Sequence, residues 1–413
     1  MQNLRDLLIF FILSSTSFNA QGVTNLKQLF SAARSYTAKL KDKAIEEEIA
    51  KKEKSKAMAG VLPSLSATSS NVWRDQADVG AFGEGYQRTS YFTLSQPLFQ
   101  GGAEYYALKI AGQRPEIARL EKKNAELNLY SEVASLFYTV VRLRQNQTTY
   151  KEQEGTLFRR VTTLKQRAKI GRNKQTDVLS AESQLARVRA ELSQIESQRL
   201  RYEQNLLNLT GVSELGLLTD DLDLNKLEVP SEWQKTLLET PRIRATELAL
   251  ENSKKEVGVV RSQFLPSVDL DANYYIERSG ILKDSDWDVT INAKWNLFSS
   301  GEDISEKQIK DLEVRKLENY FLEEKRNIKN DFESLTKEFL LQKAVVSKLE
   351  QAVKLAEKNY KQHIKEANQG LVSHLDVLKV LEDYLQVRQS YDQQLYNAKV
   401  TWANLEAMAG VLP

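Results

Sequence analysis

The sequence predicts an α+β membrane protein in which one arrangement, a β-hairpin followed by two long helices, occurs twice along the chain. Three observations predict it. Short motifs recur in the same order about 199 residues apart, one segment alternates apolar and polar residues over eleven positions, and helical periodicity continues through segments of about 65 residues.

The composition argues against several classes of protein. The 413 residues include 58 basic and 56 acidic side chains, a net charge of +2, and no tail of a single sign, so nucleic acid is not an expected partner. The chain has no cysteine. We therefore expect no disulfide, no thiolate metal site and no lipid anchor on an N-terminal cysteine. We also expect no cofactor.

The first 20 residues are predicted to be a secretory signal peptide. Arg5 precedes the apolar run from Leu7 to Leu13, and the small and polar stretch from Ser14 to Ala20 follows. The alternative is a buried N-terminal segment. After Leu13 no apolar run approaches the roughly 20 residues that a transmembrane helix needs, so we expect any membrane crossing to use strands.

The internal repeat rests on four landmarks. Leu-Pro-Ser occurs at 62–64 and 265–267, and Leu-Phe before a glycine at 98–99 and 297–298. Asp-Val-Leu occurs at 177–179 and 376–378, and an Asn-Leu and Gly-Val pair closes each half. Their constant order predicts two structural repeats.

The predicted domains follow from these landmarks. The first repeat, 21–212, contains a helix, a β-hairpin over 62–99, a long helix over 102–168, a tip over 169–176 and a returning helix over 177–211. An acidic connector occupies 213–230. The second repeat, 231–413, contains a helix from Glu232 to Arg261, a β-hairpin over 265–298, a long helix over 302–367, a tip over 368–375 and a returning helix over 376–410.

The clearest strand runs from Trp287 to Leu297, with apolar odd positions and polar even positions. A soluble sandwich shows the same alternation. Two details favour lipid: the strands have about the 9–11 residues of a tilted transmembrane strand, and Trp287 and Trp295 bracket the apolar face about 26 Å apart. The residues predicted to face lipid are Trp287, Val289, Ile291 and Trp295.

Four strands cannot close around a pore, and open strand edges are not tolerated in lipid. We therefore expect several copies of the chain to complete one barrel. Three copies would give twelve strands, an even number, although this physical argument does not determine the number of copies.

The long helices carry a coiled-coil pattern. Apolar residues step by threes and fours through both the long helix of the second half and the returning helix of the first, and a helix of about 65 residues is about 100 Å long. Such patterns usually mark filaments or tethers. Each long helix here follows a membrane-type hairpin, which favours a membrane protein.

These features together resemble the TolC-like outer-membrane efflux proteins over essentially the whole mature chain. The most specific matches are the Leu-Pro-Ser strand starts, the junction of Pro97 to Phe99 with Gly101-Gly102, and the tips that run from glycine to Asp-Val-Leu. The resemblance implies a homotrimer whose twelve-stranded transmembrane β-barrel, four strands per protomer, continues into a periplasmic α-helical coiled-coil barrel. It implies a passive exit duct of a tripartite efflux or type I secretion system, docked to a periplasmic adaptor (membrane fusion) protein and coupled indirectly to an inner-membrane RND, ABC or MFS transporter.

The resemblance also assigns roles to residues. The predicted pore-lining residues are Asp269, Asp271, Asp288, Thr290, Asn292 and Lys294. The predicted adaptor-docking residues at the tips are Gly171, Arg172, Thr176, Gly370, Leu371 and Ser373. The predicted periplasmic gate residues are Asp177, Asp376 and Lys379.

The gate assignment has an alternative. A carboxylate just after a turn commonly complements the dipole at the start of a helix, whereas three copies around an axis would form a ring that favours cations. Lys379 near Asp376 would neutralise part of such a ring.

Two other function classes compete with a duct. An enzyme is not expected, because His363 and His374 are the only histidines and no nucleophile–base set or metal spacing is visible. A periplasmic or secreted coiled-coil scaffold without channel activity is the stronger competitor.

Overall fold

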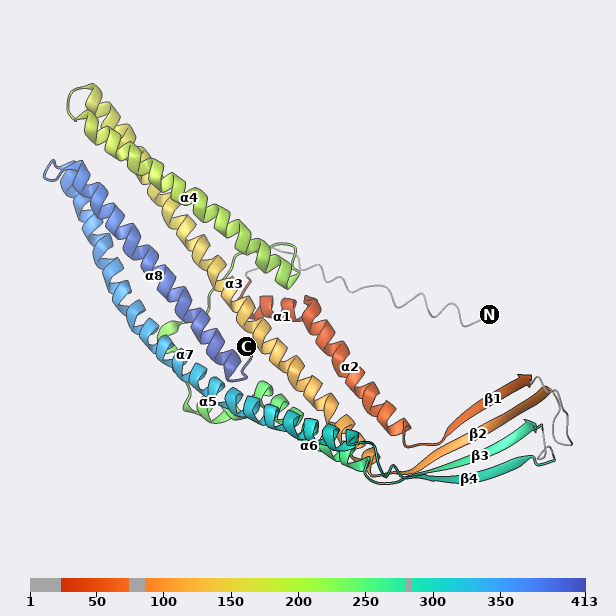
Figure 1. Cartoon of the computed structure of the whole chain (residues 1–413). Helices are drawn as coiled ribbons and strands as arrows, with labels where there is room; N and C mark the ends of the chain where they lie inside the picture. Colours follow the sequence, from red (N-terminus) through yellow and green to blue (C-terminus); the bar gives the residue numbers. More distant parts are fainter. Residues whose placement is uncertain (1–23, 74–85, 280–283) are drawn as a thin grey trace. The chain divides into compact units, whose positions relative to one another are not determined.

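The computed structural model describes residues 24–73, 86–279 and 284–413 (Figure 1). The predicted signal peptide, 1–20, lies outside these residues. Contacts divide the chain into two compact units, one formed by 1–40, 126–235 and 330–413 and the other by 41–125 and 236–329. Among the residues described, no helix combines the length and the apolar character needed to span a bilayer.

The elements of the first half are two helices, two strands and two long helices. They are α1 (Leu26–Tyr36), α2 (Ala38–Ala59), β1 (Ser64–Trp73), β2 (Tyr86–Gln100), α3 (Ala103–Lys169) and α4 (Gln175–Thr210). The connector contains the short 3-10 helix η1 (Leu224–Lys226).

The second half has the same order of helices and strands, except that a 3-10 helix lies between the two helices that precede its hairpin. Its elements are α5 (Ser231–Thr236), the 3-10 helix η2 (Leu237–Glu239), α6 (Pro241–Ser262), β3 (Ser267–Glu277), β4 (Trp287–Lys294), α7 (Glu302–Asn368) and α8 (His374–Met408). The prediction of one helix from Glu232 to Arg261 is therefore wrong. Pro241 has no backbone N–H for a helix interior, so Thr240 is extended and Pro241 starts a new helix.

Other boundaries also differ from those predicted. β4 ends at Lys294 rather than at Leu297, because β3 begins only at Ser267 and Lys294 is the last residue with a partner there. Pro266, just before β3, has no N–H to donate. The returning helices begin at Gln175 and His374, two residues before the predicted starts, so both tips are shorter.

The sheet belongs to the second compact unit, and all neighbouring strands are antiparallel. The order is β1-β2-β3-β4, so the central pair β2–β3 joins the two halves of the chain (Figure 1). The register of β2 on β3 shifts between Pro97 and Phe99. A proline inside a sheet is tolerated at such a bulge because it cannot donate to the ladder.

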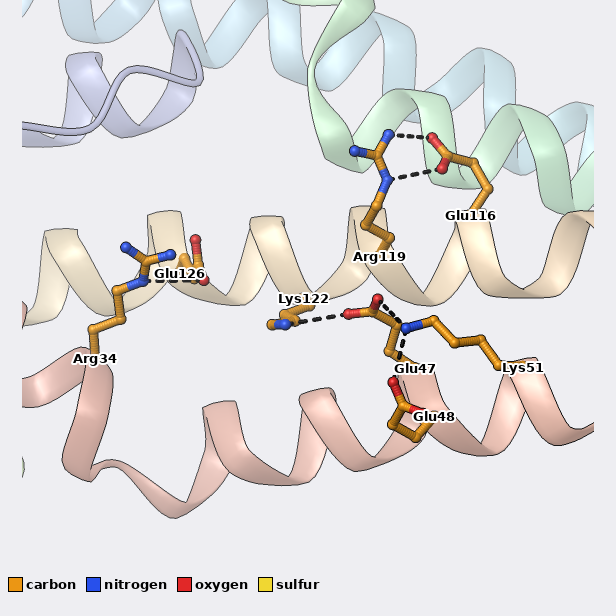
Figure 2. Close-up of polar contacts among 8 residues, drawn as sticks. All are labelled: Arg34, Glu47, Glu48, Lys51, Glu116, Arg119, Lys122 and Glu126. Carbon is orange, nitrogen blue, oxygen red and sulfur yellow. Dashed lines mark hydrogen bonds and ion pairs between the residues drawn. The ribbon is translucent and has the colours of Figure 1, made fainter.

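Ion pairs connect α2 with the first part of α3 in the same unit. Glu47 of α2 binds Lys51 of its own helix at 3.0 Å and Lys122 of α3 at 3.2 Å (Figure 2). Arg114 of α3 reaches Glu53 of α2 at 2.6 Å. The two pairs that join α2 to α3 are partly exposed, so they add little to stability and chiefly select the register of the two helices.

The first compact unit has an aromatic core. The Trp402 ring lies 5.3 Å from Trp233 and 5.2 Å from Phe339, and Phe30 packs edge-on against Tyr130 at 5.4 Å. Aromatic pairs at these distances are worth about 0.5–1.5 kcal/mol beyond the area that they bury. They hold α1, α5 and α8 to the middle of the long helices.

The junction between β2 and α3 is tightest at Gly101. Its φ is 65°, and a Cβ built there would lie 2.2 Å from the backbone oxygen of Ser262 at the end of α6. Gly102 is also left-handed, with φ of 85°, but a Cβ there would have no described atom within 4 Å. Two adjacent glycines therefore have the same backbone requirement and different surroundings.

We expect Gly101→Ala to lower the melting temperature more than Gly102→Ala. Both changes place a Cβ on left-handed backbone, which costs about 1–2 kcal/mol, but only the first also drives a methyl group into the Ser262 carbonyl. Thermal unfolding of the detergent-solubilised protein, followed by circular dichroism, measures both. Equal melting temperatures would show that the junction can move to accept the methyl group.

Candidate functional site

One face of the four-stranded sheet is apolar. In-register pairing puts Leu65, Leu94, Ala272 and Val289 in one row across all four strands, and Leu270 and Ile291 in the next. On β1, β2 and β4 the side chains of these rows are exposed, Ile291 to 66%, whereas Leu270 and Ala272 of β3 are half-buried. A contiguous exposed apolar surface of this kind marks contact with lipid or with another protein.

The opposite face is polar and internally hydrogen-bonded. The Thr93 hydroxyl donates to Asn273 at 2.7 Å, and the Asn273 amide donates to Asp288 at 2.9 Å. Asp271 accepts from Ser95 at 2.6 Å and from Asn292 at 2.9 Å. Cross-strand polar pairs stabilise a sheet that must present this face to water.

The predicted residues of the second hairpin separate onto these two faces. Trp287, Val289 and Ile291 lie on the apolar face. The set Asp269, Asp271, Asp288, Thr290, Asn292 and Lys294 lies on the polar face. Trp295 lies just beyond β4, where its indole N–H donates to the Phe264 carbonyl at 3.1 Å.

The first hairpin carries an aromatic pair that the sequence did not single out. Trp73 is the last residue of β1 and pairs with Tyr86, the first residue of β2. Their ring centroids are 5.4 Å apart, and Trp73 is 74% exposed. Period two from Leu65 leads to Trp73, but Ser69 and Asn71 interrupt the apolar series and conceal it.

The two tips have the same backbone. The N–H of Gly171 donates to Ala168 and that of Arg172 to Arg167, and the pairs Gly370–Ala367 and Leu371–Glu366 repeat this pattern. This is a Schellman motif, which needs a left-handed residue, and the two glycines have φ of 72° and 79°. Arg172, Thr176, Leu371 and Ser373 are exposed around these turns.

The two predicted gate carboxylates have different local roles. Asp376 forms a capping box with Ser373: its carboxylate accepts from the Ser373 hydroxyl at 2.6 Å and from the Ser373 N–H at 3.1 Å. These hydrogen bonds lower the pKa of the Asp376 carboxyl. Asp177 instead accepts from the Asn173 amide at 3.2 Å, and the N-cap of α4 is Lys174, which makes no side-chain cap. Lys379 is exposed one turn into α8.

Both tips rest on one apolar cluster. Val178 and Val377, the residues after the two aspartates, are each 1% exposed and pack in a cluster with Leu164 and Leu381. The cluster draws on α3, α4, α7 and α8. The helices that lead to both tips therefore share one apolar core within one compact unit, and each aspartate directly precedes a residue of that core.

Two lysines that the sequence analysis did not identify bind the acidic connector, 213–230, to the long helices. Lys399 of α8 is 5% exposed, pairs with Asp220 and donates to the Leu222 carbonyl at 2.6 Å. Lys343 of α7 donates to the carbonyl of Leu227 at 2.8 Å. The sequence holds no signal for this role, because the burial of Lys399, which makes its ammonium need a partner, results from tertiary packing.

The family model "Outer membrane efflux protein" matches residues 29–212 and 233–411. The chain is 26% identical to protein CyaE of Bordetella pertussis over 189 residues, which spans 44% of this chain and only 40% of CyaE. It is 22% identical to the outer membrane protein TolC of Vibrio cholerae over 320 residues, 74% of this chain and 72% of TolC.

Solved structures show the same fold. The outer membrane channel CmeC of Campylobacter jejuni superposes with a TM-score of 0.84 at 16% identity, covering 93% of this chain and 85% of CmeC. The family model covers both halves, including both hairpins and both tips. The chain therefore belongs to the outer membrane efflux protein family, whose members are located in the outer membrane.

Proposed function

We propose that the chain is the passive exit duct of a tripartite efflux or type I secretion system, working as a homotrimer without catalysis. Three copies would bring twelve strands together into one transmembrane barrel, and the long helices would form the periplasmic part of the tube. A periplasmic adaptor would dock at the tips and link the duct to an inner-membrane RND, ABC or MFS transporter.

The two-faced sheet is the observation that carries this proposal. Its apolar face suits outer-membrane lipid, and its polar face, with Asp269, Asp271 and Asp288, suits a water-filled lumen. In the described residues β1 and β4 each pair on one side only, so each has an open edge. Open edges in lipid must be paired, and further copies of this chain can supply the partners.

The tips supply the proposed gate and docking surface. Around a threefold axis, Asp177 and Asp376 would each form a ring of three carboxylates, which favours cations and narrows the passage. Within one chain, the hydrogen bonds from Ser373 lower the pKa of the Asp376 carboxyl, which favours its charged form. The capping role of Asp376 is compatible with this, because a capping carboxylate retains its charge.

A periplasmic scaffold is the competing function. It would have no use for an exposed apolar sheet face, and it would be recovered without detergent. Recovery of the protein in the soluble periplasmic fraction would therefore end the duct proposal.

We expect Ile291→Arg to block trimer assembly in the membrane. Arginine on the lipid face near mid-depth costs about 2–4 kcal/mol per protomer. The control is Thr290→Arg, one residue away on the polar face, which we expect to assemble. Trimer yield in detergent extracts, measured by native gel electrophoresis or mass photometry, compares them. Normal assembly of Ile291→Arg would contradict the assignment of the lipid face.

We expect Asp376→Asn to raise the leak conductance or weaken cation block of channels in planar bilayers. Asparagine can still accept a hydrogen bond from Ser373, so the helix start is retained while the charge is lost. Because the pKa of Asp376 is lowered, the carboxylate is charged above that pKa and loses charge only as the pH falls through it. Cation block of the unaltered protein should therefore persist at about pH 5, above the reference pKa of an aspartate.

The control for this substitution is Asp383→Asn, which removes an exposed carboxylate about two turns into α8. It should leave conductance and block unchanged. If Asp376→Asn also matches the unaltered protein in both properties, Asp376 is a helix cap and not part of a gate.

A further inference from the structure

The two tips share a backbone but differ in charge. The segment 165–177 of the first tip holds five cations and one carboxylate, a formal charge of +4. The equivalent segment of the second tip, 364–376, holds one lysine and two carboxylates, a formal charge of −1 with histidine neutral. The cations of the first tip are Lys165, Arg167, Lys169, Arg172 and Lys174, and the residues 199 positions later are Ile364, Glu366, Asn368, Leu371 and Ser373.

The fold of the tip does not need these cations. Both turns are closed by the same backbone hydrogen bonds, whether Arg172 or Leu371 follows the glycine. Cations near the end of α3, such as Lys169, do complement the helix dipole. Lys174 does the opposite, because it is the N-cap of α4, where the positive end of the dipole repels a cation.

The second tip shows what local stability favours at the position of Lys174. Ser373 occupies the same position before α8 and caps that helix with its hydroxyl. Serine is among the best N-cap residues, and replacing such a cap typically costs about 1 kcal/mol. The first tip has a lysine at this position and lacks this stabilisation. We infer that Lys174 serves contact with another molecule, and not the stability of α4.

Three of the five cations of the first tip are also available to a partner. Lys165 is already paired with Glu182. Lys169, Arg172 and Lys174 are exposed, and none of them forms an ion pair with any residue that the structure describes. Ile170 lies among them with 65% of its surface exposed, whereas the second tip exposes Leu371 to 71%.

We propose that the first tip, 169–174, is a docking surface for an acidic protein segment, in which partner carboxylates meet Lys169, Arg172 and Lys174 around an apolar contact at Ile170. The proposal rests on the proposed function and deepens it, because it gives the adaptor a stated chemistry: a helical hairpin whose turn carries glutamates or aspartates. The uncharged rim of the second tip selects an apolar side chain instead, so the two tips are not interchangeable.

The test uses the full-length protein in detergent and two fluorescent, disulfide-stapled helical hairpin peptides. One peptide carries four glutamates beside its turn, and the other carries four lysines at the same positions. Fluorescence anisotropy is measured in about 0.1 M and about 1 M salt, where the Debye length is about 10 Å and about 3 Å. In the lower salt, we expect the glutamate peptide to bind about tenfold more tightly than the lysine peptide. In the higher salt, we expect the two peptides to bind equally.

The variant Lys169→Glu/Arg172→Glu/Lys174→Glu should lose or reverse this preference. The matched control, Lys337→Glu/Lys348→Glu/Lys358→Glu, changes the net charge equally at exposed positions of α7 and should keep it. No preference in the unaltered protein, or equal loss in both variants, overturns the proposal. Tip-dependent binding to phosphatidylglycerol vesicles without a preference for the glutamate peptide also overturns it, in favour of a lipid surface.

The proposed duct function is read separately, from the conductance of the unaltered protein in planar bilayers. If no channels form, the duct proposal fails. If channels form and the hairpin preference is absent, only the acidic-partner proposal fails.

Discussion

The unpaired edges of the four-stranded sheet are the constraint on which the rest of the structure depends. β1 and β4 carry rows of backbone N–H and C=O groups that have no strand beside them in the described part of the chain. Water can satisfy such groups, but lipid cannot, and each unsatisfied group in hydrocarbon costs several kcal/mol. In the assembly that we propose, strands of further copies would pair with these two edges.

Two hairpins, one from each half of the chain, make up that sheet. Each half supplies one hairpin, and β2 of the first half pairs with β3 of the second over most of its length. The polar rows continue across this central pair, since Thr93 and Ser95 of the first half hold Asn273 and Asp271 of the second. Neither half could present both a wide apolar face and a hydrogen-bonded polar face alone.

The sequence predicts structure best in long segments where apolar residues recur at one regular spacing. Strict alternation in β4 predicted which residues share a face. The register confirms that Val289 and Ile291 lie on one face of the sheet and Thr290 and Asn292 on the other. It was weaker where one residue decides the outcome. Pro241 breaks a helix that the apolar pattern would continue, and the absence of a ladder partner after Lys294 ends β4 early.

Contacts between distant parts of the chain were beyond such reasoning. Lys399 and Asp220 are 179 residues apart, and only the fold shows that one is the buried partner of the other. Trp73 and Tyr86 likewise require the register of the first hairpin before they appear as an aromatic pair. Spacing along the sequence holds no information on pairings of this kind, because they depend on tertiary packing.

The two tips have the same turn but different side chains around it. The Schellman turn is closed by main-chain hydrogen bonds, so side chains around it can change without loss of the turn. At the second tip the capping pair of Ser373 and Asp376 stabilises the helix start. At the first tip Lys174 occupies the capping position, and the start of α4 has no side-chain cap. Val178 of α4 is buried in the same apolar cluster as Val377 of α8. Burial of an aliphatic side chain is worth about 1.5–3 kcal/mol, which exceeds the roughly 1 kcal/mol of a cap. The packed core below the tips thus leaves the first tip free to carry a charge pattern that its own helix does not favour.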